Sequence, residues 1–467
     1  MVRTRAAISP TGYPHIGTIY QAWFDYAFAK KNKGQFIVRI EDTDKDRTVA
    51  DAEEKVFAAL DWFNLMEDES PRKGGSYAPY RQSERLEIYK KYALELVNKG
   101  KAYYCFCSKE RLDEMRQKKQ KEGKVPMYDK HCRNLAKEEV QERIKKESWV
   151  IRLRVPENTQ IIMKDELRKE IVFQSNDVDE QVLLKSDGYP TYFLAVVVDD
   201  HLMGVTHMVR GEEWLTSSAK IILLYDFLDW KKPLFFHTPI IRNPDKSKFS
   251  KRQGHTNVSW YQEQGFLPEV VLNYLSLMGW SHPKGKEIFS REEFIQLFDL
   301  KDINVAAPIF DLKKLEWMNG MYIRKSQKSK VKSQIVDFYK KQKVIFDEVL
   351  VEKTIPLIQE RIKKLSDYLP MCEFFFKPPE KYEIDLSGKK ELFKQISKDL
   401  EKIKNWTVDN IGNQLVQTAK NSELKNSEFF MLLRVAITGK KISPPLNESM
   451  EILGKEECVK RVKELTG

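Results

Sequence analysis

The chain has 467 residues, of which 41% are hydrophobic and 32% charged, and its 80 Lys and Arg against 69 Asp and Glu give a net charge of +11. This length and composition provide for about three domains with sizeable cores and exclude a disordered or collagen-like chain. No apolar run reaches the roughly 18 residues that span a bilayer, and the modest positive charge permits a polyanionic partner without requiring one.

The N-terminal segment favours a cytoplasmic protein, and this expectation bears on how the cysteines are interpreted. The sequence MVRTRAAISPTG has neither the apolar core of a signal peptide nor the Ser- and Arg-rich pattern of a transit peptide. Three of the five cysteines, Cys105, Cys107 and Cys132, lie close together in sequence. In a reducing compartment, such a cluster indicates a metal site sooner than a disulfide framework.

The first part of the chain alternates strand and helix signals. Strands are predicted at 4–8 and 35–40, and amphipathic helices at 15–31 and 51–63. A turn cluster, Ser9-Pro10-Thr11-Gly12, separates the first strand from the first helix. This order predicts the opening of a Rossmann-like, doubly wound α/β sheet.

An insertion is predicted from about residue 103, where the composition becomes highly charged. Its expected elements are helices at 109–124 and 135–146 and strands at 149–155 and 171–173. The βα rhythm then resumes with a strand at 191–198, a helix around 214–228 and a strand at 235–241. After Trp260 the pattern is mostly helical, and Lys377-Pro378-Pro379 interrupts it, because consecutive prolines cannot continue a helix.

Two motifs contain side chains that suit the binding of a phosphate group. Pro14-His15-Ile16-Gly17 stands where the first helix begins, and a helix N-terminus favours an anion. Lys248-Phe249-Ser250-Lys251-Arg252 places three cations in a polar loop, which suits a polyphosphate clamp. Taken alone, the first motif more often marks a helix-capping histidine, and the second is as often a solvated basic loop.

Together these motifs resemble the two signatures of class I aminoacyl-tRNA synthetases, and longer blocks are similar to the bacterial glutamyl-tRNA synthetase family. The blocks lie at 3–12, 36–44, 185–192, 199–201, 210–214, 317–320 with Arg324, 433–434, 438–439, 443–444 and 453–456. The resemblance therefore covers nearly the whole chain.

The resemblance implies a class I, Rossmann-like catalytic domain with an inserted α+β acceptor-stem domain, followed by an all-α anticodon-binding region. The predicted boundaries are catalytic half 1 at 1–84, the insertion at 85–195, catalytic half 2 at 196–246, a stem-contact region at 247–326 and the helical anticodon region at 327–467, with a subdomain boundary near 378. Most members of the family are monomers.

The implied activity is that of a glutamate-tRNA ligase. Glutamate and ATP, with Mg²⁺, give glutamyl-adenylate and pyrophosphate, and the terminal adenosine of the tRNA for glutamate then accepts the glutamyl group. His15, Lys248 and Lys251 would stabilise the charge that develops on the triphosphate. Family members usually require bound tRNA before the first step.

The resemblance also implies which residues bind the substrates. Those for glutamate are Arg5, Ala7, Ser9, Glu41, Tyr192 and Arg210, and those for ATP are His15, Gly17, Glu213, Ile241, Lys248, Ser250, Lys251 and Arg252. The arginines suit a side-chain carboxylate and Glu41 the ammonium group, although each alone could equally form a structural ion pair. Val196 stands where the family often has Asn.

Cys105, Cys107, Tyr128 and Cys132 resemble the zinc knuckle of some bacterial family members. Three thiolates suit a structural, tetrahedral Zn²⁺, for which Tyr128 or His131 would be the fourth ligand. The alternative is three reduced thiols without a metal. In the helical region, cations mix with aromatic residues as in RNA-binding surfaces, and Arg361 is the residue implied to read the anticodon.

Four rival functions remain for such a chain. A glutamine-charging relative would end in β-barrels, and a truncated relative that modifies a tRNA base would lack the C-terminal region. A small nucleotidyltransferase shares the His-x-Gly turn but has no long C-terminal half. A non-enzymatic RNA-binding protein would have no reason to keep both phosphate motifs.

Overall fold

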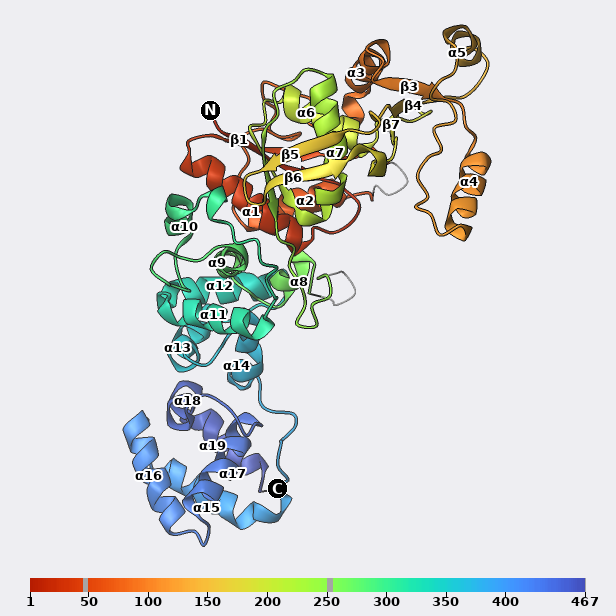
Figure 1. Cartoon of the computed structure of the whole chain (residues 1–467). Coiled ribbons are helices and arrows are strands. Elements are labelled where there is room, and N and C mark those ends of the chain that lie inside the picture. Colours follow the sequence, from red (N-terminus) through yellow and green to blue (C-terminus); the bar gives the residue numbers. More distant parts are fainter. Residues whose placement is uncertain (45–48, 250–254, 467) are drawn as a thin grey trace. The chain divides into compact units, whose positions relative to one another are not determined.

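The computed structural model describes residues 1–44, 49–249 and 255–466 (Figure 1). It divides into two compact units: an α/β unit, Met1–Trp260 with Leu272–Asp311, and a helical unit, Tyr261–Val271 with Leu312–Gly467. No helix of the described chain is long and apolar enough to cross a membrane.

The elements follow one another in this order. The strands are β1 (Arg3–Ile8), β2 (Gln35–Ile40), β3 (Ala102–Cys105), β4 (Val150–Leu153), β5 (Gln160–Asp165), β6 (Lys169–Gln174), β7 (Val182–Leu184), β8 (His207–Gly211) and β9 (Leu234–Thr238). The helices up to Asp311 are α1 (Ile16–Lys31), α2 (Ala52–Trp62), α3 (Leu86–Asn98), α4 (Lys109–Lys121), α5 (Lys137–Ile144), α6 (Tyr192–Leu202), α7 (Ser218–Phe227), α8 (Val258–Glu263), α9 (Pro268–Gly279) and α10 (Arg291–Leu297). The remaining helices are α11 (Leu312–Lys325), α12 (Lys328–Lys341), α13 (Glu348–Ile358), α14 (Tyr368–Phe376), α15 (Lys390–Glu401), α16 (Val408–Lys420), α17 (Asn426–Thr438), α18 (Leu446–Leu453) and α19 (Lys455–Glu464).

Parallel strands form the centre of the α/β unit. β1 pairs with β2, and β8 pairs with β9, both in parallel. β8 lies beside β1, because the backbone N–H of Thr206 donates to the carbonyl oxygen of Arg3 at 3.0 Å. Ligands of such sheets bind beyond the carboxyl ends of the strands, so the segments that follow β1, β8 and β9 are the expected position of a site.

The insertion joins this sheet rather than merely standing beside it. β5 and β6 form an antiparallel hairpin, and Asp165 at the end of β5 pairs in parallel with Phe235 of β9. The sheet order is therefore β6-β5-β9-β8. A separate antiparallel sheet, β3-β4-β7, carries α4 and α5 at the far end of the insertion (Figure 1).

The predicted strand at 191–198 is wrong. These residues lie almost entirely in α6, and Phe193 to Val198 are buried on all sides within the core of the α/β unit. A continuous apolar run shows neither the period of a strand nor that of a helix, and its valines favoured the wrong choice. The strand of the second catalytic half is β8, which begins only at His207.

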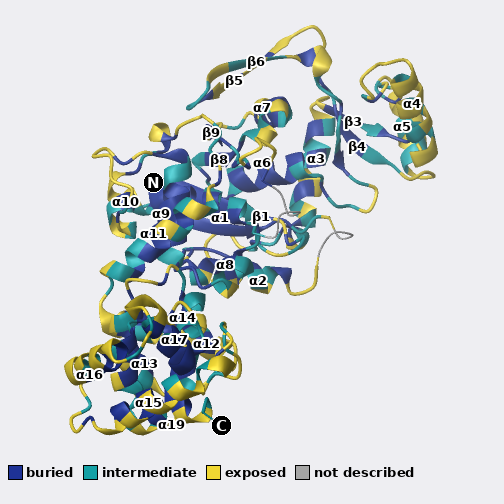
Figure 2. Ribbon diagram, turned by 90° about the horizontal axis from the view of Figure 1, so that it is seen from below, coloured by how far each residue is buried: buried dark blue, intermediate teal, exposed yellow. Residues whose placement is uncertain are grey.

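The helical unit agrees with the predicted all-α C-terminal region. Its helices α15 to α19 enclose one apolar core, which includes Phe393, Leu415, Leu433 and Val462. Figure 2 shows the buried residues gathered inside this unit and the exposed ones around its surface. The chain between Phe376 and Lys390 has no α-helix, and the proline pair lies within it.

A network of buried charges ties α6 to the neighbouring elements. Asp199 accepts hydrogen bonds from Arg85 Nε at 2.8 Å and from the Tyr89 hydroxyl at 2.8 Å. Arg39 lies 3.7 Å from the same carboxylate through its Nε. Each of these residues is at most 4% exposed, so the carboxylate of Asp199 compensates cations that water cannot reach.

We expect Asp199→Ala to destabilise the α/β unit by about 3–5 kcal/mol, because it leaves buried cations without their partner. As a control, Asp113→Ala removes an exposed carboxylate that pairs with Arg116 at 2.9 Å on α4, and we expect a change below about 0.5 kcal/mol. Denaturant unfolding followed by circular dichroism measures both. Equal effects of the two variants would contradict the structural role of Asp199.

Candidate active site

The segments that follow β1, β8 and β9 enclose a cavity of about 460 Å³. Five residues predicted to bind ATP line it, namely His15, Gly17, Glu213, Ile241 and Lys248. His15 of the first motif and Lys248 of the second therefore line the same cavity. The predicted residues Ser250, Lys251 and Arg252 lie outside the described part of the chain.

His15 caps the first helix with one ring nitrogen. Its Nδ1 accepts a hydrogen bond from the backbone N–H of Gly17 at 2.9 Å. Because Nδ1 is the acceptor, the neutral ring carries its proton on Nε2, and that nitrogen is the donor. The capping role thus uses Nδ1, and Nε2 is the atom that a phosphate-binding role would use.

Lys248 is held at the edge of this cavity by its neighbour in the chain. Phe249 is buried, stacks on Phe310 with ring centroids 4.7 Å apart, and lies edge-on to His15 at 6.1 Å. The Lys248 side chain is 61% exposed, and its Nζ lies 3.9 Å from Glu213 Oε1. An exposed cation beside a fixed anchor suits the binding of an anionic ligand.

A second cavity of about 150 Å³ lies beside the first. All six residues predicted to bind glutamate line it: Arg5, Ala7, Ser9, Glu41, Tyr192 and Arg210. The two cavities share the wall residues Ala7, Ile8, Ser9, Thr18, Gln21 and Trp214. Two ligands bound there would be in direct reach of each other.

Arg5 is partly engaged by the protein. Its Nε donates to Asp200 Oδ2 at 3.1 Å and its Nη1 to the Val209 carbonyl oxygen at 3.0 Å. Burial acts to lower the pKa of Arg5, but the Asp200 carboxylate outweighs it and the pKa is raised overall. Arg5 is therefore a fixed cation in the cavity wall, held through its Nε and Nη1.

Glu41 lies in the same wall and pairs with Arg39, whose Nη2 donates to it at 2.9 Å. Burial raises the pKa of Glu41, and the charge of Arg39 opposes this rise. Arg5 and Glu41 thus do not pair with each other; each is oriented by a different buried residue.

Arg210 has one nitrogen that makes no well-formed hydrogen bond within the described part of the chain. Its Nε donates to His237 Nε2 at 2.9 Å and its Nη2 to Ser218 Oγ at 2.5 Å. This nitrogen is Nη1, which is buried. Burial lowers the pKa of this guanidinium from its usual value, although Tyr192 lies close enough to favour the charged form and acts to raise the pKa. An unpaired donor in a cavity wall is costly unless a ligand oxygen satisfies it.

Comparison with known proteins decides the family. Residues 1–317 match tRNA synthetases class I (E and Q), catalytic domain, and residues 324–466 match an anticodon binding domain. The chain is 42% identical to a glutamate-tRNA ligase of Acidothermus cellulolyticus over 480 residues, which cover 99% of this chain and 95% of that one. The chain belongs to the class I glutamate-tRNA ligases.

Two further relatives agree with this assignment. A glutamate-tRNA ligase of Pseudomonas entomophila is 44% identical over 462 residues, covering 97% of this chain and 92% of that one. The solved structure of a glutamate tRNA ligase from Elizabethkingia meningosepticum, in complex with its amino acid, has a TM-score of 0.89 and 34% identity, and covers 100% and 99% of the two chains. The predicted family, fold class and enzyme class are confirmed.

Sequence reasoning missed several residues of this ligase's site. Trp214 lines both cavities and stacks on Tyr192 with ring centroids 4.4 Å apart. Thr18, Gln21 and Asp25 line the smaller cavity from α1. Their i, i+3, i+7 spacing places them on one face of the helix, and polar residues at that spacing in an apolar helix were the available signal.

Val196, by contrast, is fully buried in the core of the α/β unit and does not line either cavity.

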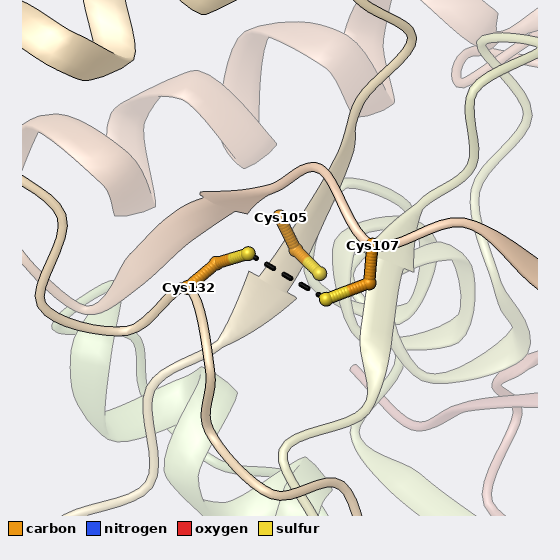
Figure 3. A group of neighbouring side chains, drawn as sticks. All are labelled: Cys105, Cys107 and Cys132. Atoms are coloured by element: carbon orange, nitrogen blue, oxygen red, sulfur yellow. Dashed lines mark hydrogen bonds between the residues drawn. The ribbon is translucent and has the colours of Figure 1, made fainter. Parts of the chain in front are cut away.

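Three of the five cysteines of this ligase lie close together. The sulfurs of Cys105, Cys107 and Cys132 lie within 4.8 Å of one another (Figure 3), and those of Cys107 and Cys132 are 3.6 Å apart. Zn–S bonds of about 2.3 Å in a tetrahedron place sulfurs about 3.8 Å apart, so this spacing fits the ion. The hydrogen bonds that Cys132 and Tyr128 donate hold the pKa of Cys105 well below its usual value and favour its thiolate form, while burial and the same hydrogen bonds raise the pKa of Cys132 and of Tyr128.

The structure distinguishes the two candidate fourth ligands. The Tyr128 hydroxyl lies 3.4 Å from Cys105 Sγ and 3.3 Å from Cys107 Sγ. His131 is exposed and is not among the donors that cluster here. Tyr128 is therefore the residue positioned to complete the set.

Arg361 lies on the surface of the helical unit, directly after α13. Its charge acts on Arg434, whose pKa is lowered first by burial and then by Arg361. Two cations therefore lie near each other on this surface, and such a pair attracts phosphate.

We expect Gly17→Ala to slow adenylate formation about ten- to a hundredfold, because a Cβ at this position would lie 3.0 Å from His15 Nδ1 and displace the ring. ATP–pyrophosphate exchange in the presence of tRNA measures this. Gly388→Ala is the control, since a Cβ there meets nothing within 4 Å. Exchange rates that are equal for the two variants would contradict a role of the His15 position.

Proposed function

We propose that the chain makes glutamyl-tRNA in two steps at the two adjoining cavities. The α-carboxylate of glutamate attacks the α-phosphorus of ATP and displaces pyrophosphate, which leaves glutamyl-adenylate. The 2′-hydroxyl of the terminal adenosine of the tRNA for glutamate then attacks the acyl carbon and releases AMP. The shared walls of the two cavities are the observation that carries this assignment, because they bring the reacting atoms of two ligands together.

ATP occupies the larger cavity. The Nε2 proton of His15 and the N-terminus of α1, where Gly17 permits close approach, face its phosphates. Lys248, with Ser250, Lys251 and Arg252 of the same motif, neutralises the triphosphate, and Glu213 and Ile241 contact the nucleoside. Mg²⁺ is held mainly by the phosphates, since this ion keeps several waters and needs few protein ligands.

Glutamate occupies the smaller cavity. Arg210 Nη1 and Arg5 bind the side-chain carboxylate, and Glu41 binds the ammonium group. Tyr192 contributes its hydroxyl, and Ala7 and Ser9 lie against the amino acid where the two cavities meet. An apolar or amide side chain would leave the arginine donors unsatisfied, which is the physical basis of selectivity for an acid.

The remaining regions bind tRNA. The insertion at 85–195 contacts the acceptor end, residues 247–326 contact the stem, and the helical region at 327–467 binds the anticodon, with Arg361 as a direct contact. The net charge of +11 supports a polyanionic partner. The enzyme acts in the cytoplasm as a monomer.

Cys105, Cys107, Cys132 and Tyr128 hold a structural Zn²⁺. The ion would crosslink β3 to the segment around Cys132, and it takes no part in the reaction. A small region with few buried apolar residues gains much of its stability from such a site; neither α4 nor α5 has a buried residue of its own.

We expect Arg210→Gln to raise the KM for glutamate about a hundredfold or more and to leave the KM for ATP nearly unchanged, because a charge-assisted contact is lost at one ligand only. Arg291→Gln is the control, since Arg291 donates to the carbonyl oxygens of Phe63 and Asn64 and lines neither cavity. Pyrophosphate exchange with tRNA gives both constants. Wild-type protein without any exchange, with or without tRNA, would instead favour an RNA-binding protein.

Protein purified without chelators should contain about one zinc ion per chain. Tyr128→Phe should weaken zinc retention against a chelator, and His131→Ala should not, because only Tyr128 contacts the sulfurs. Metal analysis before and after dialysis measures this. Far less than one zinc per wild-type chain would contradict the site, and zinc loss in His131→Ala alone would make His131 the fourth ligand.

A further inference from the structure

A chain of buried hydrogen bonds connects the inserted hairpin with the glutamate-side cavity. It runs from Asp165 at the end of β5, through His237 on β9, to Arg210 on β8. We infer that Asp165 and His237 are positioning residues that fix Arg210 for recognition of the glutamate side chain. The inference rests on the proposed role of Arg210.

His237 is the centre of this chain and is fully buried. Its Nδ1 lies 2.7 Å from Asp165 Oδ2, and its backbone N–H donates to the same oxygen at 3.1 Å. Its Nε2 accepts from Arg210 Nε at 2.9 Å and lies 3.2 Å from Ser218 Oγ. Both ring nitrogens are therefore committed, one to each side.

The chemistry of arginine fixes the proton positions in this chain. Arginine can only donate, so His237 Nε2 must carry a lone pair and Nδ1 must carry the proton. The carboxylate of Asp165 accepts that proton's hydrogen bond and so selects the required tautomer. Burial lowers the pKa of His237 in spite of Asp165, which agrees with a neutral ring.

Asp165 is itself locked into the hairpin. Its Oδ1 accepts the backbone N–H groups of Leu167 and Arg168, each at 2.9 Å, in the turn between β5 and β6. Arg168 adds a second link, because its Nε donates to the carbonyl oxygen of His237 at 3.2 Å. The position of the hairpin and the position of the His237 ring thus depend on each other.

These contacts fix the orientation of the Arg210 guanidinium. His237 holds Nε and Ser218 holds Nη2, so two of the three nitrogens of the planar guanidinium are fixed. The direction of the third, Nη1, is then determined, and it is the nitrogen that makes no well-formed hydrogen bond in the described chain. A donor that is already oriented needs no rearrangement when a carboxylate binds.

Two substitutions of His237 separate this role from simple packing. Asparagine places its amide near the Nδ1 position, so His237→Asn keeps a donor for Asp165 and removes the acceptor for Arg210. Glutamine reaches the Nε2 position, so His237→Gln restores an acceptor for Arg210. Both variants replace the buried ring by a polar amide, but asparagine is one methylene shorter than glutamine, so their stabilities must be compared alongside their kinetics.

We expect His237→Asn to raise the KM for glutamate at least about tenfold, as loss of a hydrogen bond to a charged group does, with the KM for ATP within about twofold of wild type. His237→Gln should recover most of this loss. Pyrophosphate exchange with tRNA gives the constants, and thermal unfolding compares the stability of the variants.

Ser218→Ala is a second test that leaves His237 in place. It should raise the KM for glutamate several-fold, because Arg210 Nη2 loses its acceptor.

Three results would overturn the inference: a wild-type KM for glutamate in His237→Asn and Ser218→Ala, an equal rise in the KM for both substrates, or a His237→Gln variant as impaired as His237→Asn at equal stability. Arg210→Gln distinguishes the underlying assumption. If that variant has a wild-type KM for glutamate, the proposed glutamate site is wrong; if its KM rises while the His237 and Ser218 variants are unaffected, only the positioning role is wrong.

Discussion

The carboxylate of Asp200 is the constraint on which the substrate site depends. It accepts hydrogen bonds from Arg39 Nη1 at 2.6 Å and from Arg5 Nε at 3.1 Å, and all three residues are at most 3% exposed. Burial acts to raise the pKa of Asp200, but the two guanidinium groups lower it overall. Removing one member of such a buried set of charges destabilises the fold by far more than the intact set stabilises it. The set therefore holds α6, β1 and β2 in one relative arrangement.

At His15 and Arg210 a structural hydrogen bond engages one atom of the side chain, and a different atom is the one proposed to bind the ligand. His15 caps α1 through Nδ1, and Arg210 is held through Nε and Nη2. A structural role and a binding role are therefore not alternatives for these side chains. The structural bond is what orients the remaining donor, and a preoriented donor stabilises developing charge without reorganisation.

The sequence was sufficient for features that depend on local patterns. Two short-range signals agree with the structure: the order of strand, turn and helix around His15, and the spacing of the clustered cysteines. The strand predicted at 191–198 failed because α6 is buried all round and shows no periodicity. His237 and Trp214 could not be assigned from local patterns, since their roles arise from Asp165 and Tyr192, which other segments bring to them.

The strand pairing makes the contacts of His237 depend on the position of the inserted hairpin. An insertion that only protruded from a loop could change without effect on the sheet, but β5 pairs with β9 and ends in a side chain that the sheet buries. Any displacement of the hairpin must move Asp165 or break its bond to His237, and both outcomes disturb the acceptor of Arg210. A ligand that displaced the hairpin would therefore change the geometry around Arg210, and by linkage a ligand bound at Arg210 would change the affinity for the first by the same factor.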